Sequence, residues 1–214
     1  MDLFDDPIPA AAQTHIALGA VLLHGFARDE AAALLHAVES VLQLAPLRHM
    51  QTPGGHTMSV AMSNCGPLGW VSSVSGYRYA ALDPLSNQPW PAMPACLLDL
   101  AQRAAAQAGY PHFEPDACLI NQYVPGTKMS LHQDKDELDL SAPIVSLSLG
   151  LPAVFLFGTP SRKERPQRYR LVHGDVVVWG GPSRLAFHGV APLAEGEHAH
   201  LGRRRVNLTF RRTR

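Results

Sequence analysis

The sequence predicts a mainly β protein with two helices in its N-terminal half and a barrel or jelly roll in its C-terminal half. Three observations predict this fold class. From Pro115 onward, short β-rich runs follow one another between turn signals: ACLINQY, IVSLSLGL, AVFLF, RYRLV, DVVVW and VNLTF. No helical pattern interrupts these runs, whereas two amphipathic helical patterns precede them. The length of 214 residues suits one domain that buries its own core.

Two helical patterns lie in the N-terminal half. After Asp29, a potential N-cap, apolar residues recur on one helical face as far as Ala45, and Pro46 ends the run. The second pattern begins near Pro94, and Gly109 is placed as its C-terminal cap. We therefore expect a helix in each of these segments.

Residues 46–92 lie between the two helices and are rich in Gly, Pro, Ser and Asn. This composition indicates short irregular strands and loops. The segment also carries aromatic residues that we expect to be exposed: Trp70, Tyr77, Tyr79 and Trp90. We therefore expect one compact domain in which residues 1–114 form an N-terminal extension with a lid at about 46–92, and residues 115–214 form the β core.

Composition and charge exclude several classes of protein. The 18 basic and 18 acidic residues balance, whereas a nucleic-acid binder with a large footprint carries a surplus of positive charge. Arginines nevertheless cluster in SRKERPQRYR and in RRRVNLTFRRTR, and arginine is suited to binding carboxylate or phosphate. No apolar stretch is long enough to span a membrane, and the three cysteines form no CxxC pair. We expect a soluble, cytoplasmic monomer that does not bind membranes.

A metal site is indicated by His132 and Asp134, which lie two residues apart and so on the same side of an extended segment. The pair alone is weak evidence, because composition predicts about 0.6 such matches by chance. His188, which follows the apolar run LAF, adds a third ligand. Two histidines and one carboxylate form the facial triad that leaves positions open on non-haem Fe(II). His173 and Asp175 instead flank a glycine before a strand, which indicates a hairpin turn.

The C-terminal β-rich run alternates in character. Arg205, Asn207 and Arg211 are offset by two and six residues, so they share one face of a strand whose other face is apolar. The run spans ~20 Å at strand rise, so its two guanidinium groups could contact the two ends of a short dicarboxylate. Asn121 and Tyr123 share a face of the first β-rich run in the same way.

In combination, these segments resemble the AlkB family of Fe(II)- and 2-oxoglutarate-dependent dioxygenases. The resemblance rests on NQYVPG from Asn121, HQD from His132, His188, and RVNLTFR from Arg205. It extends through QTPGGHTMSVAMSNCGPLGW, DPLSNQPWPAMP and HGDVVVWGG, and it covers nearly the whole chain. The resemblance implies a double-stranded β-helix (jelly roll) core with a nucleotide-recognition lid.

The resemblance also implies the residues that hold the metal and the cosubstrate. His132, Asp134 and His188 would hold Fe(II). Charge-assisted hydrogen bonds would bind 2-oxoglutarate, the distal carboxylate at Arg205, Asn207 and Tyr123, and the iron-chelating carboxylate near Arg211 and Asn121. Gln122 belongs to the same implied cosubstrate set.

A further set of residues is implied to bind the substrate. Trp70 would stack on a base that has left its helix, with the His132 ring opposite. Asp136 would favour a base that methylation has made cationic. The other implied substrate contacts are Met62, Tyr77, Arg78, Tyr79 and Arg162. The neighbouring acids Glu137 and Asp139 are interpreted as part of a solvated loop.

The implied activity is oxidative demethylation of N-alkylated bases of the 1-methyladenine and 3-methylcytosine type. The reaction consumes O2 and 2-oxoglutarate and releases formaldehyde, succinate and CO2, which repairs alkylation damage. The implied partner is a flipped base in single-stranded DNA, with RNA or duplex DNA as further possibilities. Two alternatives stay open: the same chemistry on RNA, a protein or a small molecule, and a non-catalytic module that binds a metal or nucleic acid.

Overall fold

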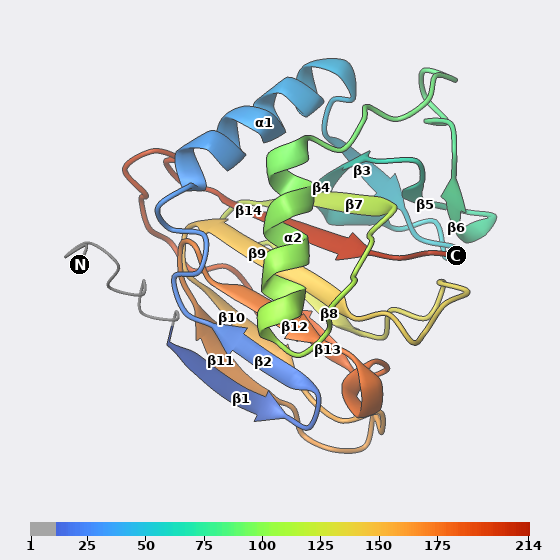
Figure 1. The fold of residues 1–214 in the computed structure, drawn as a ribbon. Coiled ribbons are helices and arrows are strands. Elements are labelled where there is room, and N and C mark those ends of the chain that lie inside the picture. Colours follow the sequence, from blue (N-terminus) through green and yellow to red (C-terminus); the bar gives the residue numbers. More distant parts are fainter. Residues whose placement is uncertain (1–11) are drawn as a thin grey trace.

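The computed structural model describes residues 12–214, which form a jelly roll with two helices on its outside (Figure 1). Its first elements are β1 (Gln13–Ala17), β2 (Ala20–Leu23), α1 (Ala31–Leu44), β3 (Arg48–Gln51), β4 (Thr57–Cys65), β5 (Gly69–Ser73), β6 (Gly76–Ala80) and α2 (Ala95–Gln107). They are followed by β7 (Ala117–Tyr123), β8 (Met129–His132), β9 (Ile144–Gly150), β10 (Ala153–Phe157), β11 (Gln167–Leu171), β12 (Val176–Trp179), the 3-10 helix η1 (Gly181–Ser183), β13 (His188–Val190) and β14 (Arg205–Arg211). The predicted mainly β fold with two N-terminal helices is confirmed.

Two antiparallel sheets face each other. The larger sheet has the strand order β1-β2-β12-β9-β14-β7-β4-β3, and the smaller sheet has the order β11-β10-β13-β8. Apolar side chains of both sheets meet between them, where Ile144 and Trp179 of the larger sheet belong to one buried cluster with Phe155 and Phe157 of the smaller sheet. The space between the sheets is therefore a packed core, and the polar side chains described below occupy one end of it.

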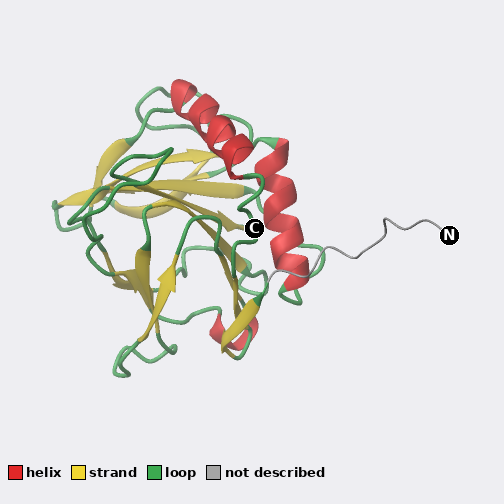
Figure 2. Ribbon diagram, turned by 90° about the vertical axis from the view of Figure 1, so that its left-hand side faces the viewer, coloured by secondary structure: helices red, strands yellow, loops and turns green. Residues whose placement is uncertain are grey.

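Helices α1 and α2 cover the outer face of the larger sheet (Figure 2). Their apolar faces, which include Leu34 and Val38 of α1 and Leu97 and Ala101 of α2, are buried in one cluster with the strands. Isolated helices of this length are marginal in water, so apolar burial, at about 25 cal/mol per Å², stabilises them more than helix propensity does. No helix within residues 12–214 is long and apolar enough to cross a membrane.

Of the two predicted helix caps, the one at the end of α2 is present and the one at the start of α1 is not. The N-cap position of α1 is occupied by Glu30, which makes no side-chain capping hydrogen bond, so the expectation of Asp29 as N-cap is wrong. At the end of α2, Gly109 adopts a φ of +90° and its amide donates to the Ala106 carbonyl. A glycine tolerates this left-handed conformation without steric cost, and the predicted C-terminal cap is confirmed.

Each of the six β-rich runs after Pro115 forms a strand at the predicted place. The structure adds the hairpin of β1 and β2, together with β8 and β13, which are four and three residues long. Strands this short do not show a readable alternation in a sequence. They are defined by pairing with each other and, for β13, with β10.

Residues 46–92, where we expect a lid, are divided between two sheets. β3 and β4 belong to the larger sheet, where β4 pairs with β7 along five residues, and only β5 and β6 form a separate two-stranded sheet. Trp90 is also buried rather than exposed, because its Nε1 donates to the Ala80 carbonyl and the Arg48 guanidinium lies over its ring. β4 contains several polar residues, so its composition did not predict a strand of the main sheet. Composition also does not show which strand will pair with it.

Candidate iron and 2-oxoglutarate site

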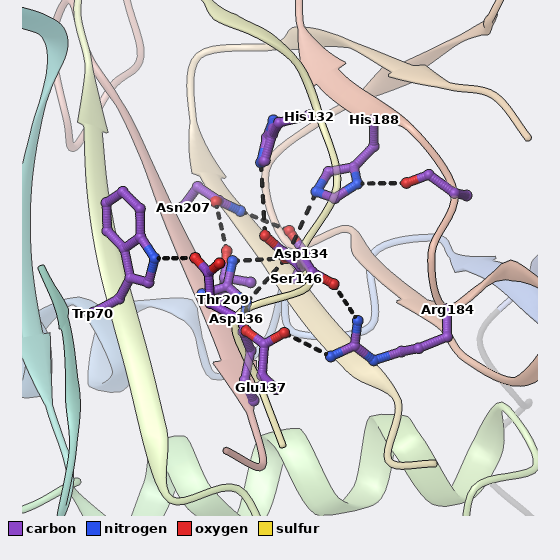
Figure 3. Close-up of polar contacts among 12 residues, drawn as sticks. Trp70, His132, Asp134, Asp136, Glu137, Ser146, Arg184, His188, Asn207 and Thr209 are labelled. Carbon is purple, nitrogen blue, oxygen red and sulfur yellow. Dashed lines mark hydrogen bonds and ion pairs between the residues drawn. The ribbon is translucent and has the colours of Figure 1, made fainter. Parts of the chain in front are cut away.

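Three ligand-type side chains converge at one end of the smaller sheet (Figure 3). His132 ends β8 and His188 begins β13, and the two residues are direct partners in the antiparallel register. Asp134 follows two residues after His132, and its carboxylate oxygens lie 3.7 Å from the Nε2 atoms of both histidines. All three ligand atoms lie within 4.8 Å of one another. This arrangement fits a metal held on one face with its other coordination positions open.

Hydrogen bonds orient both histidines for metal binding. The His132 Nδ1 lies 2.8 Å from the Ser130 carbonyl oxygen, and the His188 Nδ1 lies 3.0 Å from the Ala186 carbonyl oxygen. Only a protonated Nδ1 can donate to a carbonyl, so each Nε2 keeps its lone pair for a metal. Burial lowers the pKa of His188 to about 4, helped by repulsion from His132, so this imidazole is neutral at neutral pH.

The Asp134 carboxylate is held in its charged form by an arginine. Burial by itself would raise the pKa of Asp134, but the charge and the hydrogen bonds of the Arg211 guanidinium hold it well below its usual range. Arg211 donates from Nε and Nη2 to the same Asp134 oxygen, at 2.9 and 2.7 Å. Asp134 and His188 therefore have the protonation states that a divalent metal requires.

The inner face of β14 carries polar side chains, as its alternation predicts. Arg205, Asn207, Thr209 and Arg211 are all buried on this face. The Asn207 amide already donates to the Ser146 hydroxyl and the Leu147 carbonyl, and its oxygen accepts from Thr209. Both the amide nitrogen and the amide oxygen of Asn207 therefore already have hydrogen-bond partners within the protein.

Arg205 is a buried cation without a carboxylate partner within residues 12–214. Its side chain is almost fully buried, its Nη2 donates to the Ser148 hydroxyl at 2.8 Å, and its guanidinium lies 4.9 Å from the centre of the Tyr123 ring. Its Nε and Nη1 atoms have no hydrogen-bond partner among the described residues, nor does the Asn121 Oδ1. Burying an unpaired cation is costly, so this position is suited to an anionic ligand such as the distal carboxylate of 2-oxoglutarate.

Gln122 does not join this group. Neighbouring residues of a strand point to opposite faces, so Gln122 lies opposite to Asn121 and Tyr123, and its oxygen is 3.5 Å from the Arg204 Nη1 near the surface. The expectation that Gln122 binds the cosubstrate is not supported by its position. The alternation that placed Asn121 with Tyr123 already excluded it.

Comparison with known proteins agrees with this geometry. The model of the 2OG-Fe(II) oxygenase superfamily matches residues 19–211. Over 211 residues the chain is 56% identical to the alpha-ketoglutarate-dependent dioxygenase AlkB of Escherichia coli (strain K12), covering 99% of this chain and 97% of the relative. This chain belongs to the AlkB family. It is a dioxygenase whose residues His132, Asp134 and His188 fit Fe(II), with 2-oxoglutarate and O2 as cosubstrates.

The chain is also similar to a more distant relative in sequence and to a solved structure in fold. The tRNA demethylase abh1 of Schizosaccharomyces pombe is 35% identical over 160 residues, which cover 69% of this chain and 53% of that protein. A solved structure titled "The structure of OsALKBH1" matches with a TM-score of 0.80 and 28% identity, covering 94% of this chain and all of that one.

The substrate residues expected for an AlkB-family enzyme lie around β5 and β6. The Trp70 Nε1 donates to the Asp136 carboxylate at 3.0 Å (Figure 3). The Trp70 ring also stacks on Tyr77, with ring centres 5.4 Å apart. Tyr77 and Arg78 are exposed, whereas Met62 is fully buried in the cluster beneath Trp70. Met62 therefore supports the wall under the tryptophan.

Tyr79 and Arg162 complete the expected substrate set: Tyr79 is the register partner of Trp70 in the antiparallel pair of β5 and β6, whereas Arg162 lies between β10 and β11. Tyr79 is largely buried and its hydroxyl donates to Glu137; burial and the nearby acids raise the pKa of Tyr79, although Arg211 opposes them. Arg162 is exposed, and its guanidinium lies 5.7 Å from the centre of the Phe187 ring. Tyr79 thus contacts the protein interior, and Arg162 stands beside the residue that precedes His188.

Glu137 corrects the expectation of a solvated acidic loop. It is buried, and it accepts hydrogen bonds from Tyr79 and from the Arg184 Nη2 at 3.0 Å, while the Arg211 Nε lies 3.5 Å away. Asp139, by contrast, pairs with Arg212 close to the surface. No local pattern distinguishes the two acids, because the arginine that neutralises Glu137 comes from a distant turn.

Arg184 holds the loop that carries the iron ligand, and sequence reasoning missed it. From η1 it donates to the Asp134 carbonyl at 2.7 Å, to the Ala142 carbonyl at 2.9 Å and to Glu137. Its side chain is 3% exposed. One guanidinium therefore fixes both ends of residues 134–142.

We expect Arg184→Met to lower the free energy of unfolding by about 3 kcal/mol, because it leaves the Glu137 charge buried with poorer compensation. Urea unfolding measures the change. The control is Arg203→Met, which removes an exposed pair with Glu195 and should cost less than about 1 kcal/mol. A similar small change in both variants would contradict the role of Arg184.

Proposed function

We propose that this protein oxidatively demethylates 1-methyladenine- and 3-methylcytosine-type bases in single-stranded DNA and so repairs alkylation damage. The observation that carries the proposal is the Trp70–Asp136 pair beside the iron triad. An aromatic face stacks on a flipped base, and a carboxylate beside it favours the positive charge that methylation at these nitrogens creates. RNA is a second candidate, because one relative is named a tRNA demethylase.

The chain's own residues position the reaction. His132, Asp134 and His188 would hold the metal, and Arg205 would bind the distal carboxylate of 2-oxoglutarate. Arg211 keeps Asp134 ionised and faces the site from β14. When bound, Fe(II) and 2-oxoglutarate supply with O2 the oxidising chemistry that hydroxylates the methyl group. The hydroxymethylated base then loses formaldehyde, and succinate and CO2 are the other products.

The remaining expected residues bind the nucleic acid around the base. Tyr77 and Arg78 stand on the exposed hairpin of β5 and β6, which serves as the nucleotide-recognition lid, and Arg162 contacts the strand from the opposite loop. The base leaves its helix to reach Trp70, which is easiest in a single strand. We further propose that the protein acts as a cytoplasmic monomer.

The test is removal of one methyl group from a single-stranded oligonucleotide that carries one 3-methylcytosine. The protein is incubated with Fe(II), ascorbate and 2-oxoglutarate, and mass spectrometry follows the oligonucleotide. We expect loss of one methyl group that disappears with EDTA or without 2-oxoglutarate. Succinate formed beside an intact oligonucleotide would contradict the proposed substrate, and an RNA oligonucleotide tested in parallel addresses the second candidate.

The matched variant Asp136→Asn tests recognition of the charge. It keeps the shape of the side chain and removes its negative charge, so demethylation of cationic 3-methylcytosine should fall about tenfold more than that of neutral 3-methylthymine, a coupling of about 1.4 kcal/mol. The two rates are compared by the same assay. Equal losses on both lesions would refute charge recognition by Asp136.

A further inference from the structure

Unpaired positive charge is concentrated on the hairpin of β10 and β11. Its cations are Arg162, Lys163, Arg165, Arg168 and Arg170, which we call the basic hairpin. All of them are exposed, and none makes an ion pair within residues 12–214. Most other arginines of the described residues do pair with a carboxylate. Glu164, the acid within this segment, makes no ion pair among the described residues, so the five cations leave a net positive charge that is suited to an anionic partner.

Two of these cations, Arg168 and Arg170, lie on a regular strand, which fixes their spacing and direction. Arg168 and Arg170 are two residues apart on β11 and therefore project from the same face, ~7 Å apart at strand rise. Tyr169 points the other way and donates its hydroxyl to the Ile16 carbonyl, which holds the strand in register. The spacing of the two arginines is close to that between successive phosphates of a nucleic-acid strand.

The basic hairpin lies next to the iron site. His188 is the register partner of Phe157, which is in turn the partner of Gln167 at the start of β11. Two strand spacings place Gln167 about 10 Å from His188. The loop between β10 and β11 is also tied to this region, because the Phe187 amide donates to the Thr159 carbonyl. Arg168 and Arg170 pair with Leu156 and Val154 and so project from the outer face of the smaller sheet, opposite to the face that Phe157 buries. A strand whose base reaches the iron would contact them where its backbone continues over this outer face.

We propose that the basic hairpin binds the phosphodiester backbone of the substrate outside the flipped nucleotide, with Arg168 and Arg170 each contacting a phosphate. The proposal rests on the proposed function and goes beyond the single contact expected of Arg162. The enzyme then binds several phosphates of one strand at once, so a methylated polynucleotide is a better substrate than a methylated trinucleotide.

The test uses the double variant Arg168→Gln/Arg170→Gln, whose positions are exposed and leave the site unchanged. The control Arg28→Gln/Arg103→Gln also removes two positive charges, from the side of the molecule that carries the helices. Binding of an unmethylated twenty-mer is measured against salt concentration, and KM and kcat are measured for a 3-methylcytosine trinucleotide, a single-stranded twenty-mer and the same twenty-mer in a duplex. The binding arm needs no turnover, so it tests the hairpin even if 3-methylcytosine is not the substrate.

We expect the variant to raise KM for the single-stranded twenty-mer roughly fivefold and to reduce the salt slope by ~1.4, or 0.7 for each lost phosphate contact. The trinucleotide and the control variant should be unaffected, and kcat should be unchanged. A loss confined to the duplex would place the contacts on the complementary strand and so would overturn the proposal. Unchanged salt slope and KM on both twenty-mers, or an equal loss on the trinucleotide or in the control, would overturn the proposal.

Discussion

Replacement of any one of the three metal ligands, by His132→Ala, Asp134→Ala or His188→Ala, should abolish iron-dependent turnover. The three ligand atoms lie within 4.8 Å of one another, and residues 12–214 add no fourth His, Cys, Asp or Glu to this group. Loss of an outer hydrogen-bond partner of a metal ligand typically costs about 10–100-fold, and loss of a ligand should therefore cost more than about 100-fold.

Two measurements check this prediction. Succinate formation reports turnover, and thermal unfolding with and without added Fe(II) reports binding, because a ligand that binds the folded state stabilises it by mass action. The parent protein should gain stability with metal, and the variants should not. Asp139→Ala, which alters a nearby acid outside the triad, is the control. Near-normal turnover in any ligand variant would refute the iron assignment.

Arg205→Met should raise the requirement for 2-oxoglutarate by about 100-fold. The variant removes the Nε and Nη1 donors that have no partner among the described residues. Hydrogen bonds to charged groups contribute about 1.5–3 kcal/mol each, and about 3 kcal/mol in total corresponds to roughly a hundredfold in affinity. The effect should fall on KM for 2-oxoglutarate, since Arg205 does not contact the metal ligands.

A second readout separates binding from folding. Burial lowers the pKa of Arg205 and no carboxylate within residues 12–214 pairs with it, so its charge costs stability in the absence of a ligand. Arg205→Met should therefore unfold at the same or a higher temperature than the parent when 2-oxoglutarate is absent. Arg211→Met is the contrasting variant, because it leaves Asp134 without its guanidinium partner and should weaken metal binding as well. Unchanged KM in Arg205→Met would mean that the cosubstrate binds elsewhere.

Features that depend on residues close together in the chain could be predicted from the sequence. The periodicity of apolar residues predicted both helices, and alternation predicted that Arg205, Asn207 and Arg211 share a face. The spacing of His132 and Asp134 and the late His188 indicated the metal site, which the structure brings together. These patterns can be read because strand and helix geometry relate near neighbours directly.

Only the tertiary structure decided which distant residues meet. The local sequence indicates a surface acid at Glu137, but in the structure Glu137 is buried and is neutralised by Arg184, which lies 47 residues away in the chain. The length of the lid likewise depended on β4 pairing with β7, a choice that β4's own composition does not reveal. The free energy of a buried ion pair or a strand pairing belongs to both partners at once, so a pattern confined to one segment cannot predict it.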